Sequence, residues 1–164
     1  MAPRYNVLFL CTANSARSLL AEGVMNHVAP DRFRAFSAGS HPALSPHPMT
    51  LAVLAEKGYE ASSLRSKSWS EFERSAAPFL DLVITVCDNA RGETCPLWPG
   101  TPVTGHWGIE DPASQPGDGR RLREHFSRAL DEIETRIKSL IELPIETLNR
   151  EDLRRELARI GRNG

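Results

Sequence analysis

The fold is decided by the stretch Val7-Leu8-Phe9-Leu10-Cys11-Thr12-Ala13-Asn14-Ser15-Ala16-Arg17-Ser18 near the N-terminus. Its four apolar residues end abruptly at a cysteine, and small, mostly polar residues then lead to an arginine and a serine. The next segment carries apolar residues at helical spacing on one face, at Leu20, Val24 and Val28. This pattern predicts a buried strand, a tight loop and the N-terminus of a helix.

The loop between Cys11 and Arg17 is suited to binding a tetrahedral oxyanion. Backbone amides at the start of a helix point toward such an ion, and the helix dipole adds positive potential there. The same field stabilises a thiolate at Cys11, and Arg17 offers two parallel donors to the oxygens of the ion. A buried cysteine beside a surface arginine is the alternative, but the preceding strand and the following helix favour the oxyanion site. The residues predicted to bind the ion are Thr12, Ala13, Asn14, Ser15, Ala16 and Arg17.

Length and composition are those of one globular domain over residues 1–164. A net charge of −1 gives no support for a nucleic-acid partner or a membrane surface. No segment has the form of a signal peptide or a transmembrane span, so we expect a cytoplasmic location. Because thiols stay reduced there, the three cysteines are expected to be reactive or inert rather than a disulfide framework.

Strand and helix patterns alternate along the rest of the chain. They predict an α/β fold whose parallel sheet is covered on both faces. Further strands are expected at 33–39, 80–86 and 101–107, and helices at 49–57, at 72–77, between Leu122 and Pro144, and after Asn149. Pro46 and Pro48 are expected in the first turn of the helix at 49–57. Residues 144–164 are expected to form a C-terminal helical extension with a solvated basic face.

The loop resembles a known active site. Leu10 to Ser18, followed by Ala21-Glu22, is similar to the Cys-x5-Arg phosphate-binding loop of the low-molecular-weight protein tyrosine phosphatase superfamily, which includes arsenate reductases. The resemblance implies a three-layer fold with a four-stranded parallel sheet in the order 2-1-3-4. It also implies that Ser18 donates a hydrogen bond to the Cys11 thiolate. Asp111, which precedes Pro112, is implied as the general acid, with the adjacent Glu110 as the alternative.

Two further cysteines, Cys87 and Cys95, favour the arsenate reductase branch of this superfamily. Taken alone, Cys87 could be a small buried apolar residue and Cys95 incidental, and their separation lacks the usual spacing of zinc ligands. The resemblance instead implies a thiol relay without a tightly bound cofactor. Cys11 attacks arsenate, Cys87 attacks Cys11 as arsenite leaves, and Cys95 attacks Cys87. Thioredoxin then reduces the Cys87–Cys95 disulfide.

Some features depart from the patterns of both branches. Seven residues separate Cys87 from Cys95, where the thioredoxin-coupled enzymes have six, so glutathione or mycothiol with its own redoxin is an alternative reductant. The phosphatases carry Gly, Cys and Pro where this chain has Ala13, Ala16 and Leu19, and they often place tyrosines after the Asp-Pro. The absence of tyrosines after Asp111-Pro112 argues against a phosphotyrosine substrate. A phosphatase for tyrosine phosphate or small esters is the first alternative function, and a non-catalytic oxyanion or redox sensor is the second.

A potassium ion lies behind the loop in some arsenate reductases of this fold. Asn14, Glu22 and Ser37 match the positions that ligate it, but a fourth ligand is not evident in the sequence. The alternative is that Glu22 is an ordinary exposed helix residue.

Overall fold

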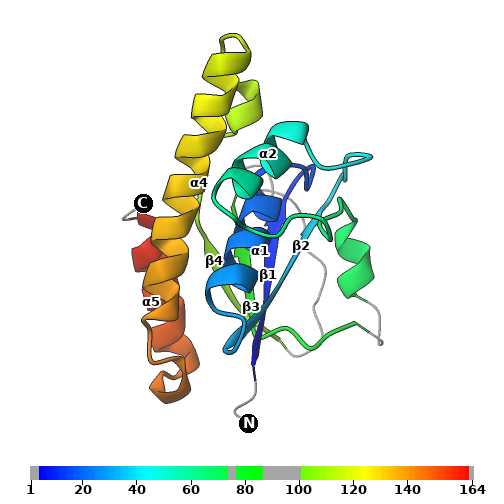
Figure 1. Ribbon diagram of the computed structural model, residues 1–164. Helices are drawn as coiled ribbons and strands as arrows, with labels where there is room; N and C mark the ends of the chain where they lie inside the picture. Colours follow the sequence, from blue (N-terminus) through cyan, green and yellow to red (C-terminus); the bar gives the residue numbers. More distant parts are fainter. Residues whose placement is uncertain (1–3, 74–76, 87–100, 163–164) are drawn as a thin grey trace.

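The computed structural model describes residues 4–73, 77–86 and 101–162, and in these ranges it contains one parallel sheet. Its strands are β1 (Tyr5–Cys11), β2 (Phe33–Gly39), β3 (Leu82–Thr85) and β4 (Val103–His106). Their order is β2-β1-β3-β4 (Figure 1), which confirms the expected order. Because β1 pairs with both β2 and β3, the loop after Cys11 begins at the centre of the sheet edge.

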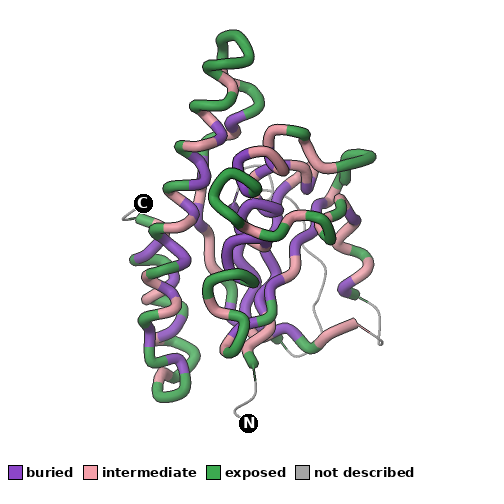
Figure 2. Tube along the Cα trace, in the orientation of Figure 1, coloured by how far each residue is buried: buried purple, intermediate pink, exposed green. Residues whose placement is uncertain are grey.

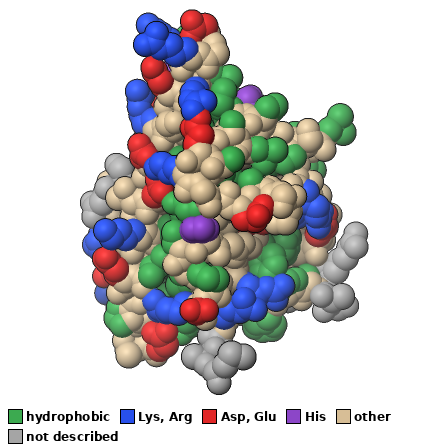
Figure 3. Space-filling model, viewed as in Figure 1, with side chains coloured by type: hydrophobic (Ala, Val, Ile, Leu, Met, Phe, Trp, Pro, Cys, Tyr) green, Lys and Arg blue, Asp and Glu red, His purple; other side chains and the backbone are tan. Residues whose placement is uncertain are grey.

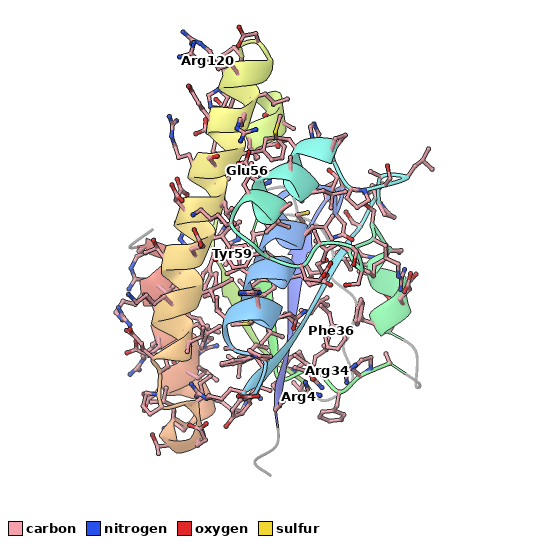
Figure 4. All side chains as sticks on the ribbon, viewed as in Figure 1. Arg4, Arg34, Phe36, Glu56, Tyr59 and Arg120 are labelled. Atoms are coloured by element: carbon pink, nitrogen blue, oxygen red, sulfur yellow. The ribbon has the colours of Figure 1, made fainter. Side chains whose placement is uncertain are left out.

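The two faces of β1 lie in two different apolar clusters, since successive side chains of a strand point to opposite sides. Val7 and Phe9 belong to the large cluster that contains the helices. Leu8 and Leu10 belong to a smaller cluster on the other face, against which Phe36 packs. Figure 2 shows this buried centre, and Figure 4 shows Phe36 on the side of the sheet away from α4. A strand buried on both faces reads as a continuous apolar run, which explains why β1 was recognisable from sequence.

The helices gather on the large cluster. They are α1 (Arg17–Val28), α2 (Pro48–Glu56), α4 (Gly119–Ile141) and α5 (Arg150–Arg162). Three short 3-10 helices accompany them: η1 (Trp69–Phe72), η2 (Pro112–Ser114) and η3 (Ile145–Thr147). Among the described residues, the second face of the sheet is covered by η1 and the segment leading to Leu80 rather than by an α-helix.

Three local expectations need correction. Val28 lines the same cavity as Val24, as expected for one helical face, although at the last residue of α1 it is 47% exposed. Pro46 lies outside α2, whose N-cap is His47 and whose first residue is Pro48. The short helix expected at 72–77 is η1, three residues earlier, and residues 74–76 lie outside the described ranges. The strand expected at 80–86 is shorter in the structure, where β3 covers only Leu82–Thr85.

The C-terminal helix α5 completes the core beside β4. The side chain of Asn149 caps it by accepting a hydrogen bond from the amide of Asp152 at 2.8 Å, as the sequence suggested. Trp107 follows β4 and donates from its indole nitrogen to the carbonyl of Leu157 at 3.0 Å. On the visible face Figure 3 shows Lys and Arg interspersed with Asp and Glu, without one large basic patch. Within the described ranges no helix is long and apolar enough to cross a membrane.

We predict that Gly39→Ala destabilises the protein. Gly39 ends β2 opposite Cys11, and a Cβ there would lie 2.3 Å from the carbonyl oxygen of Thr12. Since backbone has to move, we expect a loss of about 1–3 kcal/mol in the free energy of unfolding, measured with urea. Gly119→Ala is the control, because its Cβ meets nothing within 4 Å. Equal stability of the two variants would contradict this account of the loop's packing.

Candidate active site

Hydrogen bonds from outside the loop fix the backbone between Cys11 and α1. Its carbonyl groups face away from Cys11, toward the segment that follows β2. The oxygens of Thr12, Ala13 and Ser15 accept from the amides of His41, Ala43 and His47 at 2.9, 2.8 and 2.9 Å. Thr50 on α2 adds a hydroxyl donor to the Ser15 carbonyl at 2.8 Å. On the inner side of the loop, the backbone amide of Asn14 donates to Cys11 Sγ at 3.2 Å.

Asn14 is the residue at which this loop turns. It is fully buried and has a φ of 48°, a left-handed conformation that asparagine adopts more readily than most residues. Its side chain donates to Ser18 Oγ at 2.7 Å and to Ser37 Oγ at 3.0 Å, and accepts from the amide of Lys67 at 2.9 Å. Its carbonyl accepts from Ser66 Oγ at 2.6 Å. Every polar group of Asn14 therefore has a partner, which offsets the cost of burying it.

The sulfur of Cys11 lies at the bottom of this loop. It is 2.8 Å from Ser18 Oγ, and both residues are buried. The side-chain amide of Asn14 already donates to Ser18 Oγ, so the Ser18 hydroxyl proton is free to point at the sulfur. Hydrogen bonds from the Ser18 hydroxyl and from the backbone amide of Asn14 favour the thiolate of Cys11 over the thiol. The thiolate is the nucleophilic form.

Arg17 and Asp111 lie at the mouth of the loop. Arg17 Nη1 donates to the carbonyl of Ile109 at 2.9 Å, and its Nη2 is 3.8 Å from Asp111 Oδ2. The other carboxylate oxygen of Asp111 caps η2 by accepting from the amide of Ala113 at 3.0 Å. The adjacent Glu110 lines a small cavity with His125 and Arg128 instead. The geometry thus brings Asp111, rather than Glu110, to the arginine of the loop.

The residues expected to ligate potassium do lie together behind the loop. Ser37 Oγ donates to Glu22 Oε1 at 2.5 Å and accepts from Asn14. The ammonium of Lys67 lies among the same groups, donating to the Ser37 carbonyl at 2.9 Å and lying 3.7 Å from Glu22 Oε1. Burial raises the pKa of Glu22 and lowers that of Lys67, while their mutual attraction opposes both shifts.

Lys67 and Ser66 are the site residues that the sequence did not indicate. They fall in a polar stretch that reads as a loop, and no local pattern marks them. They reach the site because Ser68 pairs with Gly39 at the end of β2, a contact between distant parts of the chain. Cys87 and Cys95 lie outside the described residues. Within the described ranges, no three His, Cys, Asp or Glu residues come together in a way that could hold a metal ion.

Known arsenate reductases resemble the sequence over most of its length. The chain is 35% identical over 136 residues to an arsenate reductase of Shouchella clausii and 33% identical over 136 residues to one of Bacillus subtilis. Each alignment covers 83% of this chain and 94% of the relative. The predicted similarity to this group of proteins is therefore confirmed.

Solved structures agree with the sequence comparison. A thioredoxin-dependent arsenate reductase of Corynebacterium glutamicum superposes with a TM-score of 0.64 at 30% identity, over 86% of this chain and 62% of that longer chain. A low-molecular-weight protein tyrosine phosphatase from T. tengcongensis shares the fold, with a TM-score of 0.64 at 24% identity over 84% of this chain and 98% of that one. Residues 6–156 match the family model described as low molecular weight phosphotyrosine protein phosphatase. The chain belongs to the low-molecular-weight phosphotyrosine protein phosphatase family.

Proposed function

We propose that this protein is an arsenate reductase, which converts arsenate to arsenite with electrons from thiols. The observation that carries the proposal is the buried Cys11 sulfur, which lies 2.8 Å from Ser18 Oγ and accepts from the backbone amide of Asn14 at 3.2 Å. Similarity to arsenate reductases over 83% of the chain supports this choice of reaction within the family. Phosphate has the same shape as arsenate, so weak phosphatase activity is compatible with the same site.

In the first step the Cys11 thiolate attacks arsenic and forms a sulfur–arsenic bond. The leaving hydroxide needs a proton, which Asp111 supplies so that water departs. Arg17 and the inward amides stabilise the charge on the remaining oxygens. Arg17 Nη2 lies 3.8 Å from Asp111 Oδ2. This short distance supports the two roles, because the arginine and the acid can then reach the same ion.

In this proposal Cys87 and Cys95 complete the reduction of arsenic. The Cys87 thiolate attacks Cys11 Sγ, a disulfide forms, and the electron pair of the sulfur–arsenic bond stays with arsenic as arsenite leaves. Cys95 then attacks Cys87 and releases the Cys11 thiolate, and an external dithiol of the thioredoxin type reduces the Cys87–Cys95 disulfide and is itself oxidised. One feature of the described chain supports the role of Cys87. The amide of Val86 donates to the carbonyl of Leu10 at 2.8 Å, so the chain reaches the level of Cys11 one residue before Cys87.

The seven residues between Cys87 and Cys95 leave a glutathione- or mycothiol-linked redoxin as the alternative reductant. Such a relay requires a reducing compartment, which is the basis for proposing a cytoplasmic location.

The decisive experiment is arsenite production from arsenate with thioredoxin, thioredoxin reductase and NADPH. We expect turnover in the wild type and none in Cys11→Ser, Cys87→Ser or Cys95→Ser, because each variant interrupts one exchange. Dependence on a glutathione-type redoxin in place of thioredoxin would change the reductant but not the reaction. Absence of arsenite with either system, together with phosphatase activity that survives Cys87→Ser and Cys95→Ser, would assign the protein to the phosphatase branch.

A matched pair of variants tests the general acid. We expect Asp111→Asn to slow the release of arsenite by about 100-fold or more, the contribution typical of a positioned acid. Glu110→Gln removes the neighbouring carboxylate and should remain within about twofold of wild type. The measurement is arsenite formed in a single turnover of prereduced protein, which excludes any effect on the external reductant. A larger loss in Glu110→Gln would transfer the role to Glu110.

The activation of Cys11 by Ser18 is tested by its reactivity. In a Cys87→Ser/Cys95→Ser background, Ser18→Ala should slow alkylation of Cys11 by iodoacetamide at pH 7 by about tenfold, because the thiolate loses a hydrogen bond. Ser139→Ala, which removes a hydroxyl bonded to its own helix at Thr135, is the control and should have no effect. An unchanged rate in Ser18→Ala would show that the loop amides alone hold the thiolate.

A further inference from the structure

Lys67 is a buried cation behind the oxyanion loop, where its groups contact Asn14 and Ser37. Lys67 is only 9% exposed, and lysine is rarely buried unless a negative charge or hydrogen-bond acceptors pair with its ammonium. The ammonium donates to the carbonyl oxygen of Ser37 at 2.9 Å, lies 3.5 Å from Ser37 Oγ, and is 3.7 Å from Glu22 Oε1. These oxygens come from β2, which pairs with β1, and from α1, which follows the loop.

A potassium ion does not fit the same place. The oxygens of Ser37 and Glu22, which would have to surround the ion, already surround the Lys67 ammonium. A second cation among them would lie in contact with a positive charge in a site sheltered from water, where repulsion is strong. It would also meet only one carboxylate, that of Glu22, which the lysine already neutralises.

We infer that Lys67 supplies in covalent form the cation that stabilises the oxyanion loop, so that the protein binds its oxyanion without potassium. Lys67 acts through two attachments. Its amide donates to Asn14 Oδ1 at 2.9 Å, and its ammonium holds Ser37, which contacts the amide nitrogen of Asn14. Both attachments converge on the residue that turns the loop, so Lys67 is a positioning residue and does not contact the substrate.

A chain of hydrogen bonds connects this cation to the nucleophile. The ammonium fixes Ser37, whose hydroxyl contacts the Asn14 side chain at 3.0 Å. The same Asn14 amide contacts Ser18 Oγ at 2.7 Å, and Ser18 lies 2.8 Å from Cys11 Sγ. Removing the charge leaves the Glu22 carboxylate without its lysine partner, directly beside the Ser37 hydroxyl at the start of this chain.

The test measures binding of inorganic phosphate by isothermal titration, with KCl exchanged for choline chloride at constant ionic strength. We expect the wild-type dissociation constant to change by less than about twofold, because no binding free energy is coupled to potassium. In Lys67→Met we expect affinity about tenfold weaker in choline chloride and recovery in KCl, because potassium can then occupy the vacated position beside Glu22. Lys138→Met removes an exposed lysine of α4 and should behave as wild type in both salts.

Two results would overturn the inference. One is a wild-type affinity that rises several-fold with potassium. The other is a result for Lys67→Met that shows no need for the charge. The variant could bind phosphate normally in choline chloride, or its affinity could be weakened without recovery in KCl, which would mean that the lysine acts by packing. The double variant Glu22→Gln/Lys67→Met removes both charges and should bind phosphate independently of potassium. A response to potassium in the double variant would likewise contradict the role given to Glu22.

The wild-type arm and the double variant keep the test valid if Lys67→Met fails to fold. The inference concerns the same loop as the proposed reduction, but phosphate binding requires neither Cys87 nor Cys95. Failure of arsenate reduction and failure of this inference are therefore separate results.

Discussion

The structure depends most on the left-handed turn at Asn14. That conformation reverses the backbone directly after a central strand, so the backbone amide of Asn14 points back to Cys11 Sγ. An unfavourable backbone conformation persists only where its surroundings hold it, and here five hydrogen bonds do so, counting that to Cys11 Sγ. The sheet provides the partners, because β2 carries Ser37 and the segment that pairs with its end carries Ser66 and Lys67.

The sequence predicted those parts of the site that are continuous in the chain. The apolar run into Cys11, the loop and the first turn of α1 are local, and the Cys-x5-Arg spacing between a strand and a helix indicated an oxyanion site. Asp111 needed the family resemblance, since an aspartate before a proline is common in turns. Lys67 could not be found in either way. Its position follows from the pairing of Ser68 with Gly39, and such pairing between distant segments leaves no periodic signal.

A buried Glu–Lys pair is not an efficient way to gain stability. Removing water from both charges costs free energy that their attraction returns only in part, and an apolar pair would often be as stable. The arrangement of Glu22 and Lys67 suggests a different benefit. The ammonium and the carboxylate specify where the Ser37 hydroxyl points, and that direction determines where Asn14 can donate. The pair thus contributes orientation at the loop, where an apolar pair would leave Ser37 free to rotate.

Selectivity for arsenate over phosphate cannot arise from this loop, because both ions present four oxygens in the same tetrahedral arrangement. In the proposed binding mode the loop recognises shape and charge, and Arg17 and the loop amides would serve either ion equally well. What separates the two ions is the second reaction, since arsenic bound to a thiolate accepts an electron pair when another thiol attacks the sulfur. A phosphorylated cysteine has no comparable reduced product and can only be hydrolysed. In the proposed relay, the loop therefore sets binding, and Cys87 and Cys95 decide which bound ion is converted into product.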